Sequence, residues 1–204
     1  MDDLVGFKRN QSDYDYLRHI LLNLDEEKQP LSQVNFKQLY RYSQSKDEAV
    51  RWTLAEILFW DPSNEATKLL LKMMTDENIL VRCDVVESLS GKETHQVLSK
   101  IFNVVQFREE ENEIVCTYAV HSFFDLYCVL NKDLSFLKSV LEVWFNELPY
   151  IHTKLTLASL LYQLGDTSKR TYLERQQSKE ESDYAVYADI LLERLIRAEE
   201  EKSL

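Results

Sequence analysis

The sequence predicts an all-α protein, built as a right-handed α-α superhelix (a solenoid) of about five helix pairs with an N-terminal capping helix. Of the 204 residues, 45% are hydrophobic and 29% are charged, which is typical of a globular chain with a sizeable core. Only three glycines and three prolines occur, which favours helices joined by short loops over folds rich in turns. One nine-residue pattern also recurs along the chain, as a stack of similar units requires.

The recurring pattern reads V-R-C-D-V-V-E-S-L from Val81, and similar stretches begin at Val50, Val115, Thr153 and, more loosely, Asp183. If the first residue is position zero, positions 0, 4, 5 and 8 form one apolar stripe on a helix. Position 5 is small or β-branched in every copy, as the close approach of a second helix requires. Each copy is therefore expected to be a helix with one buried face, and stacked pairs are expected to share a continuous core.

The elements are expected in a regular order along one domain, residues 1–204. Residues 1–30 are predicted to form the N-terminal cap, with a helix over 13–24, and residues 34–200 the repeats. The first helices of the pairs are expected at 34–44, 64–75, 94–106, 134–147 and 168–177, and the second, inner helices at 47–60, 78–90, 112–130, 151–164 and 182–200.

Start and stop signals set these bounds. Gly91 and Gly165 are expected to end the preceding helices in the left-handed conformation. A side-chain oxygen that accepts a hydrogen bond from a free backbone N–H is expected at the next helix start. The residues in that position are Ser63, Thr94, Asp133 and the segment 166–168.

The motif V-R-x-x-x-A/V-x-x-L on the inner helices, with Asp76 in the turn before one of them, resembles the HEAT repeat. The links L-S-G-K-E-T and L-G-D-T-S resemble the short HEAT-like repeats of phycobilin lyases. The resemblance covers about residues 34–200 and departs at the last copy, where Asp183 and Tyr184 replace Val-Arg. The signatures of ankyrin and tetratricopeptide repeats are absent. The resemblance implies an α-solenoid whose inner helices line the concave side, and it specifies no function.

One column of the pattern predicts a structural ladder. Arg51, Arg82 and Lys154 occupy the second position of their copies, with Cys116 as the exception. In the family that the chain resembles, arginine at this position binds carboxylates or carbonyls at the turns. Asp76 is an expected acceptor in this ladder, and the planar guanidinium of arginine, with its five donors, suits the donor's role.

The sequence predicts no catalytic residues, no metal ligands and no cofactor. Cys83, Cys116 and Cys128 form no CxxC pair, which favours buried or half-buried, inert, reduced thiols and a cytoplasmic location. His121 and Asp125 are four residues apart on one helix, and we expect a hydrogen-bonded pair there rather than a metal site. Glycine-rich phosphate loops and nucleophile motifs are absent from the sequence.

The stripe opposite the core face of the inner helices carries the functional hypothesis. Positions 3, 6 and 10 of the copies are expected to be exposed there, Thr53, Thr156 and Ser159 included. Acids and aromatic side chains are concentrated on this stripe, a combination used by binding surfaces for basic partners. The predicted partner-binding residues are Trp52, Glu56, Trp60, Asp84, Glu87, Tyr118, His121 and Asp125. In the competing interpretation the tryptophans pack between repeats and the acids are merely solvated.

The formal net charge of −11 repels nucleic acid and anionic membranes. The chain is therefore expected to be a non-catalytic protein–protein interaction module for a basic protein, acting as a monomer and independent of nucleic acid or membrane. One form of this hypothesis is a bacterial immunity or antitoxin protein that masks a basic toxin. The N-terminus lacks the apolar run of a signal peptide, and a transmembrane helix is not expected.

Two enzymatic alternatives come from the resemblance. Some HEAT-like proteins excise alkylated bases from DNA with Trp and Asp residues, and Trp52, Trp60 and Asp84 are candidates for similar roles. The acidic charge and the lack of a basic stripe argue against a groove that holds phosphates. A phycobilin lyase is the other alternative, implied by the repeat subtype alone.

Overall fold

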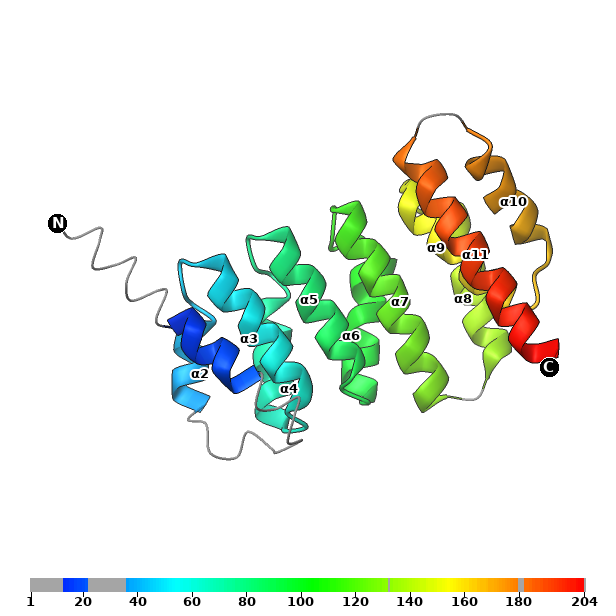
Figure 1. Ribbon diagram of the computed structural model, residues 1–204. Coiled ribbons are helices and arrows are strands. Elements are labelled where there is room, and N and C mark those ends of the chain that lie inside the picture. Colours follow the sequence, from blue (N-terminus) through cyan, green and yellow to red (C-terminus); the bar gives the residue numbers. More distant parts are fainter. Residues whose placement is uncertain (1–12, 22–35, 132, 180–181, 204) are drawn as a thin grey trace. The chain divides into compact units, whose positions relative to one another are not determined.

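The computed structural model shows an all-α fold, as predicted: every regular element in the described part of the chain is a helix (Figure 1). The chain divides into two compact units, Met1–Val97 and Leu98–Leu204, and each unit is described by itself. The residues that the structure describes are 13–21, 36–131, 133–179 and 182–203.

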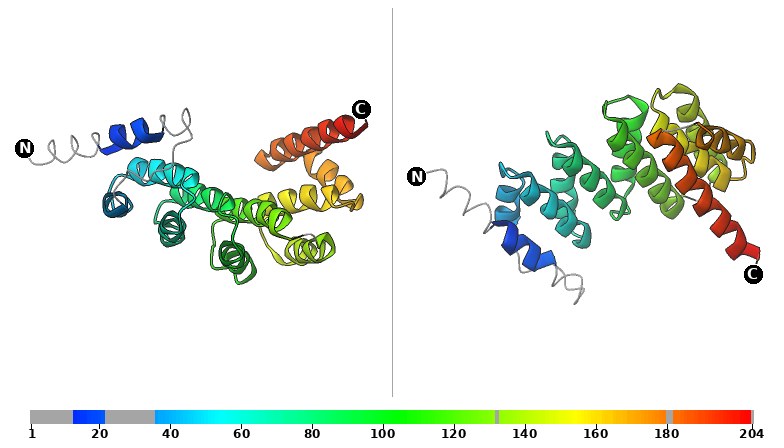
Figure 2. Two further views of the ribbon diagram at one scale, coloured as in Figure 1. Left: turned by 90° about the horizontal axis from the view of Figure 1, so that it is seen from below. Right: turned by 45° about the horizontal axis from the view of Figure 1, so that its top comes forward.

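The first unit contains a helix at residues 13–21, α2 (Phe36–Tyr42), α3 (Glu48–Trp60), α4 (Asn64–Met73) and α5 (Ile79–Ser90). The central helix is α3, which packs against α2, α4 and α5. Figure 2 shows helix 13–21, in blue, on the side of α3 that faces away from α4. Three layers result, with α3 between helix 13–21 and α4.

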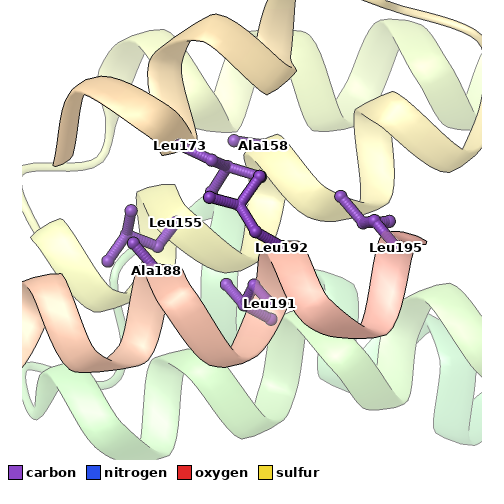
Figure 3. Close-up of a cluster of buried hydrophobic side chains, with 7 residues drawn as sticks. All are labelled: Leu155, Ala158, Leu173, Ala188, Leu191, Leu192 and Leu195. Atoms are coloured by element: carbon purple, nitrogen blue, oxygen red, sulfur yellow. The ribbon is translucent and has the colours of Figure 1, made fainter. Parts of the chain in front are cut away.

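The second unit is organised around α9, which packs against α7, α8, α10 and α11. Figure 3 shows part of its core, in which leucines and alanines of α9, α10 and α11 interlock. Another helix, α6 (His95–Gln106), crosses the boundary between the two units. The remaining helices are α7 (Glu113–Leu130), α8 (Leu134–Glu147), α9 (Ile151–Gln163), α10 (Ser168–Gln177) and α11 (Asp183–Ser203).

The helices begin and end within a few residues of the predicted bounds, and α11 runs slightly past its predicted end. The predicted cap helix 13–24 is helical over 13–21, while residues 22–24 and most of segment 1–30 lie outside the described residues. The apolar stripe is buried as predicted. Its core residues include Val50, Leu54, Ala55, Leu58, Val81, Val85, Val86, Leu89, Val115, Ala119, Val120, Phe123, Leu157, Ala158 and Leu161.

The predicted caps are found at three helix starts. The side chains of Ser63, Thr94 and Asp133 accept backbone hydrogen bonds at the first turns of α4, α6 and α8. The α10 start differs, because Thr167 makes no side-chain cap and Asp166 instead accepts a hydrogen bond from the Ser168 N–H at 3.2 Å.

The two glycine stops have different physical causes. Gly165 has a φ of +89°, the predicted left-handed conformation. The prediction for Gly91 is wrong, because its φ of −74° is right-handed. A Cβ at Gly91 would lie 2.6 Å from Cε2 of Phe59, so glycine is required there by close approach to a side chain of α3.

Lys92 follows this glycine and ties the loop after α5 to the end of α3. Its buried Nζ donates to the main-chain carbonyls of Phe59, at 2.8 Å, and of Asp61. Burial lowers the pKa of Lys92 to about 8, an effect that the nearby Asp61 carboxylate opposes. The lysine therefore satisfies carbonyls that the end of α3 leaves without helical partners.

The same turn precedes α3, α5 and α7, at Ser45–Asp47, Asp76–Asn78 and Glu110–Asn112 respectively. In each turn the first side chain accepts a hydrogen bond from the N–H of the third residue, at 3.1, 2.9 and 2.8 Å respectively. The third side chain then accepts a hydrogen bond from the N–H two residues further on and caps the helix. The sequence pattern thus recurs as a hydrogen-bond pattern.

Arg51 of α3 holds the second of these turns. Its Nε and Nη2 donate to the two carboxylate oxygens of Asp76 at 2.7 and 2.9 Å, and both side chains are nearly excluded from water. The carboxylate of Asp76 therefore pairs with Arg51, one of the two arginines of the predicted ladder. Arg82 donates from Nη1 to the main-chain carbonyl of Asp76 at 2.7 Å, just as Arg51 donates to the carbonyl of Ser45.

The third member of the predicted ladder, Lys154, forms no ion pair with the described residues. Hydroxyl groups link the helices at this place in the second unit. The Oγ1 atoms of Thr117 on α7 and Thr153 on α9 lie 3.0 Å apart and are buried. A carboxylate oxygen of Glu113 also accepts the N–H of His152 at 2.6 Å. These contacts join α7 to α9 without an arginine.

Helix α7 is long and apolar enough to cross a membrane by length and composition, with 18 residues and a mean hydropathy of 1.3. The expectation that the chain has no transmembrane helix stays a prediction, because this criterion concerns length and composition only. Half of the segment is buried inside the structure, and core helices of globular proteins pass the same test. The criterion alone is weak evidence for a membrane span.

Candidate binding surface on α3 and α5

Three acids from two helices share one pocket in the first unit. Glu56 of α3 and Asp84 and Glu87 of α5 line it together with Trp60, and its volume is about 260 Å³. We call these four residues the acidic face. Its pocket is completed by Leu21, Phe59 and Ser88.

Helical spacing and a buried hydrogen bond bring these side chains together. Glu56 and Trp60 are four residues apart on α3, and Asp84 and Glu87 are three apart on α5, so each pair shares one helix face. The Ser88 hydroxyl donates to the main-chain carbonyl of Ala55 at 3.0 Å. Because this contact requires the two helices to approach closely, the acids of α3 and α5 lie on a common surface.

The carboxylates of the acidic face repel one another. The pKa of Asp84 is raised to about 7, first by burial and then by the charges of Glu56 and Glu87. Burial also raises the pKa of Glu56, Arg18 lowers it, and Glu87 adds to the rise. Near neutral pH the pocket therefore holds negative charge, and none of the residues that line it carries a positive charge.

Two tryptophans of α3 remain open to solvent. Trp60 is 44% exposed and meets the ring of Phe59 edge to face, with 5.1 Å between centroids. Trp52 is 42% exposed, lies one turn before Glu56 and does not line the pocket. The interpretation in which the tryptophans are packed between repeats does not fit these exposures.

The other predicted partner-binding residues, Tyr118, His121 and Asp125, belong to α7 in the second unit. Tyr118 and Asp125 are exposed and His121 is half-buried. Burial lowers the pKa of His121, Asp125 opposes that change, and Arg194 of α11 adds to it. The pocket of the acidic face does not include any of these three residues.

Part of the predicted exposed stripe is wrong. Thr53, Thr156 and Ser159 are buried. The Thr53 hydroxyl donates to the Ala49 carbonyl one turn earlier, and the hydroxyl of Thr156 lies 2.9 Å from that of Tyr187 on α11. Short hydroxyl side chains are easily buried in this way because a nearby partner satisfies them.

Sequence reasoning missed the contributions of Leu21 and Phe59 to the pocket. Phe59 follows Leu58 of the core stripe, and periodicity alone gives it no role. Leu21 belongs to the predicted cap helix, and its amphipathic spacing relative to Leu17 was the available signal. No local pattern, however, indicates the surface on which such a helix lies.

The three cysteines differ in their exposure to solvent. Cys83 and Cys116 are buried, and burial raises the pKa of Cys116 to about 11, which disfavours the thiolate. Cys128 is exposed, contrary to the expectation of buried or half-buried thiols. Within the described part of the chain, no group of three or more His, Cys, Asp or Glu residues is arranged to hold a metal ion.

No protein-family model matches the chain, and neither the curated proteins nor the solved structures include a significant match. The functional interpretation therefore depends on the residues themselves.

Proposed function

We propose that this chain is a HEAT-like α-solenoid that acts as a non-catalytic protein-interaction module and binds a basic segment of a partner protein on the acidic face. The observation that carries the proposal is the pocket in which Glu56, Asp84 and Glu87 lie beside the exposed ring of Trp60. An immunity or antitoxin protein is one biological role that fits a small chain of this kind.

The repeated turns support the architectural part of the proposal. Ser45–Asp47, Asp76–Asn78 and Glu110–Asn112 use the same hydrogen bonds before consecutive inner helices. Arg51 and Arg82 each donate to a carbonyl six residues earlier in the chain. Recurrent local geometry of this kind is what stacked repeat units share.

The chemistry of the pocket supports a cationic partner. A lysine or arginine placed among three carboxylates would replace repulsion with attraction, and the open indole of Trp60 adds a cation–π surface. The net charge of −11 would accelerate the approach of a basic protein from a distance. An enzyme that holds a nucleic-acid backbone would need the opposite charge.

Charge reversal tests this proposal. The full chain and its Glu56→Lys/Glu87→Lys variant serve as baits for affinity capture from the native organism, followed by mass spectrometry. We expect the variant to recover at least about tenfold less of a basic partner than the wild-type chain does. The reason is that like charges brought together at a desolvated contact cost several kcal/mol.

The matched control is Glu65→Lys/Glu93→Lys, which makes the same change of net charge at two exposed acids of the first unit that do not line the pocket. This variant should retain the partner. Equal recovery with both variants would remove the acidic face from the proposal.

A further inference from the structure

Helix 13–21 is amphipathic, and its apolar side faces the first unit. Leu17 is completely buried, and Ile20 and Leu21 are partly buried on the same side of the helix. Tyr16, Arg18 and His19 lie on the exposed side. The described part of the helix is short and would be only marginally stable alone, so this burial holds it in place.

The helix lies beside the acidic face. Its last described residue, Leu21, lines the same pocket as Glu56, Trp60, Asp84 and Glu87. At its other end the ring of Tyr16 approaches that of Tyr42 on α2, with 6.4 Å between centroids. Figure 2 shows the helix lying over α3 on the side away from α4.

The helix also supplies a positive charge to this surface. The Arg18 guanidinium acts on Glu56 through space and lowers the pKa of that carboxyl group. It makes no ion pair with the three acids, and its Nη1 donates to the Tyr14 hydroxyl at 3.0 Å on its own helix. Arg18 therefore neutralises the acidic face only weakly.

We propose that helix 13–21 is a resident occupant of the acidic face, and that a partner binds there as a short amphipathic helix carrying lysine or arginine, which displaces it. The inference rests on the proposed function and deepens it, because it specifies the form of the basic segment. Leucines four residues apart would fill the place of Leu17 and Leu21, and added basic residues would reach the acids that Arg18 leaves unpaired. Displacement makes the resident helix an internal competitor of the partner.

The test uses the full chain and two labelled peptides with capped ends. One peptide has the sequence of residues 13–21, and the other carries Asp13→Lys and Asp15→Lys. In the chain, Leu17→Asp detaches the resident helix by placing a charge at a buried position. The control is Leu80→Asp, the same change at a leucine of α5 that is 67% exposed.

We expect fluorescence anisotropy to show at least tenfold tighter binding of the lysine peptide to Leu17→Asp than to the wild-type chain or to Leu80→Asp. On Leu17→Asp, the lysine peptide should also bind more tightly than the unmodified peptide. Equal affinity of all three chains would overturn the proposal for the resident helix. Equal affinity of the two peptides would overturn the preference for a basic occupant.

A second variant covers the case in which Leu17→Asp does not fold, as judged by circular dichroism. Arg18→Glu reverses an exposed charge and should raise the affinity for the lysine peptide several-fold over a charge-matched Lys68→Glu control on α4. Equal affinity of these two variants would also overturn the proposal. Since no partner protein takes part, this outcome is independent of the capture experiment with Glu56→Lys/Glu87→Lys.

Discussion

Arg51 and Asp76 form the most deeply buried ion pair described in the first unit, with side chains only 6% and 7% exposed. Two hydrogen bonds connect them, and a third joins Arg51 to the Ser45 carbonyl. A buried pair of this kind adds little net stability compared with apolar residues, but the loss of one partner leaves an uncompensated charge. The pair therefore fixes the register of α3 against the turn before α5.

Asp76→Asn should lower the free energy of unfolding by about 3 kcal/mol, because Arg51 stays buried without its counter-charge. The amide can still accept the hydrogen bond from the Asn78 N–H, so the turn itself is retained. Urea unfolding at neutral pH measures the change. The control is Glu77→Gln, whose carboxylate is 87% exposed at 3.5 Å from Arg51, and it should change stability by less than about 1 kcal/mol. Equal losses in the two variants would contradict the special role of the buried pair.

Asp84 predicts a pH dependence of the opposite sign to that of an ordinary ion-paired acid. The pKa of Asp84 is about 7 in the folded chain and near its ordinary value of 3.8 in the unfolded chain. The folded state binds more protons between these values, so the stability that Asp84 contributes falls as the pH rises from about 4 to about 7. Asp84→Asn should be nearly neutral at pH 4 and stabilising by on the order of 1 kcal/mol at pH 8, after allowance for solvent screening. Urea unfolding of both chains at the two pH values tests this, and a variant without advantage at pH 8 would contradict it.

At the scale of the helix, two glycines that follow helix ends are there for different physical reasons. Gly91 and Gly165 follow the ends of α5 and α9, and local sequence predicts the same left-handed stop for both. Only Gly165 adopts it. At Gly91 a side chain is excluded by Phe59, which is 32 positions earlier in the chain. A rule based on neighbouring residues cannot predict such a contact.

The two glycines are distinguished by a double-mutant cycle. Gly165→Ala should destabilise by about 1 kcal/mol in any background, since its φ is positive and no neighbour lies within 4 Å. Gly91→Ala should become more favourable by about 1 kcal/mol when Phe59→Ala removes the ring that its Cβ would meet. Urea unfolding of the single and double variants gives the coupling energy between residues 59 and 91 and that between residues 59 and 165. A coupling of zero between residues 59 and 91 would contradict the close-approach explanation.

Periodicity predicts what depends on neighbours in sequence, and this accounts for much of the fold. The buried stripe from Val50 to Leu58 and the cap at Ser63 follow from local spacing. The pairing of Asp76 with Arg51 does not follow from local spacing. Arg51 and Arg82 occupy the same position of the repeat, and that position alone does not show which of them pairs with Asp76. The acids of the pocket were predictable from the stripe, whereas the place of Leu21 depends on tertiary packing of helix 13–21.

At the scale of the whole molecule, the net charge of −11 and the arrangement of that charge have separate effects. Self-repulsion destabilises any highly charged compact chain, and salt screens it. Clustered carboxylates at short separation should contribute more of this repulsion than scattered ones. The change in the free energy of unfolding with salt concentration therefore measures the repulsion among the carboxylates of the acidic face. A basic partner would remove the same repulsion.

We expect the free energy of unfolding of the wild-type chain to rise by about 1 kcal/mol between 20 and 300 mM NaCl, because the Debye length falls well below the size of the chain over that range. Glu56→Gln/Asp84→Asn/Glu87→Gln should remove most of this rise, since it neutralises the three acids that share the pocket. The matched variant Glu65→Gln/Glu93→Gln/Glu147→Gln removes the same charge from exposed acids that do not line the pocket, and it should keep most of the rise. Urea unfolding at the two salt concentrations measures all three chains. If the rise in the free energy of unfolding with salt is reduced equally in both triple variants, net charge alone determines the repulsion. The acidic face would then contribute no more than other acids do.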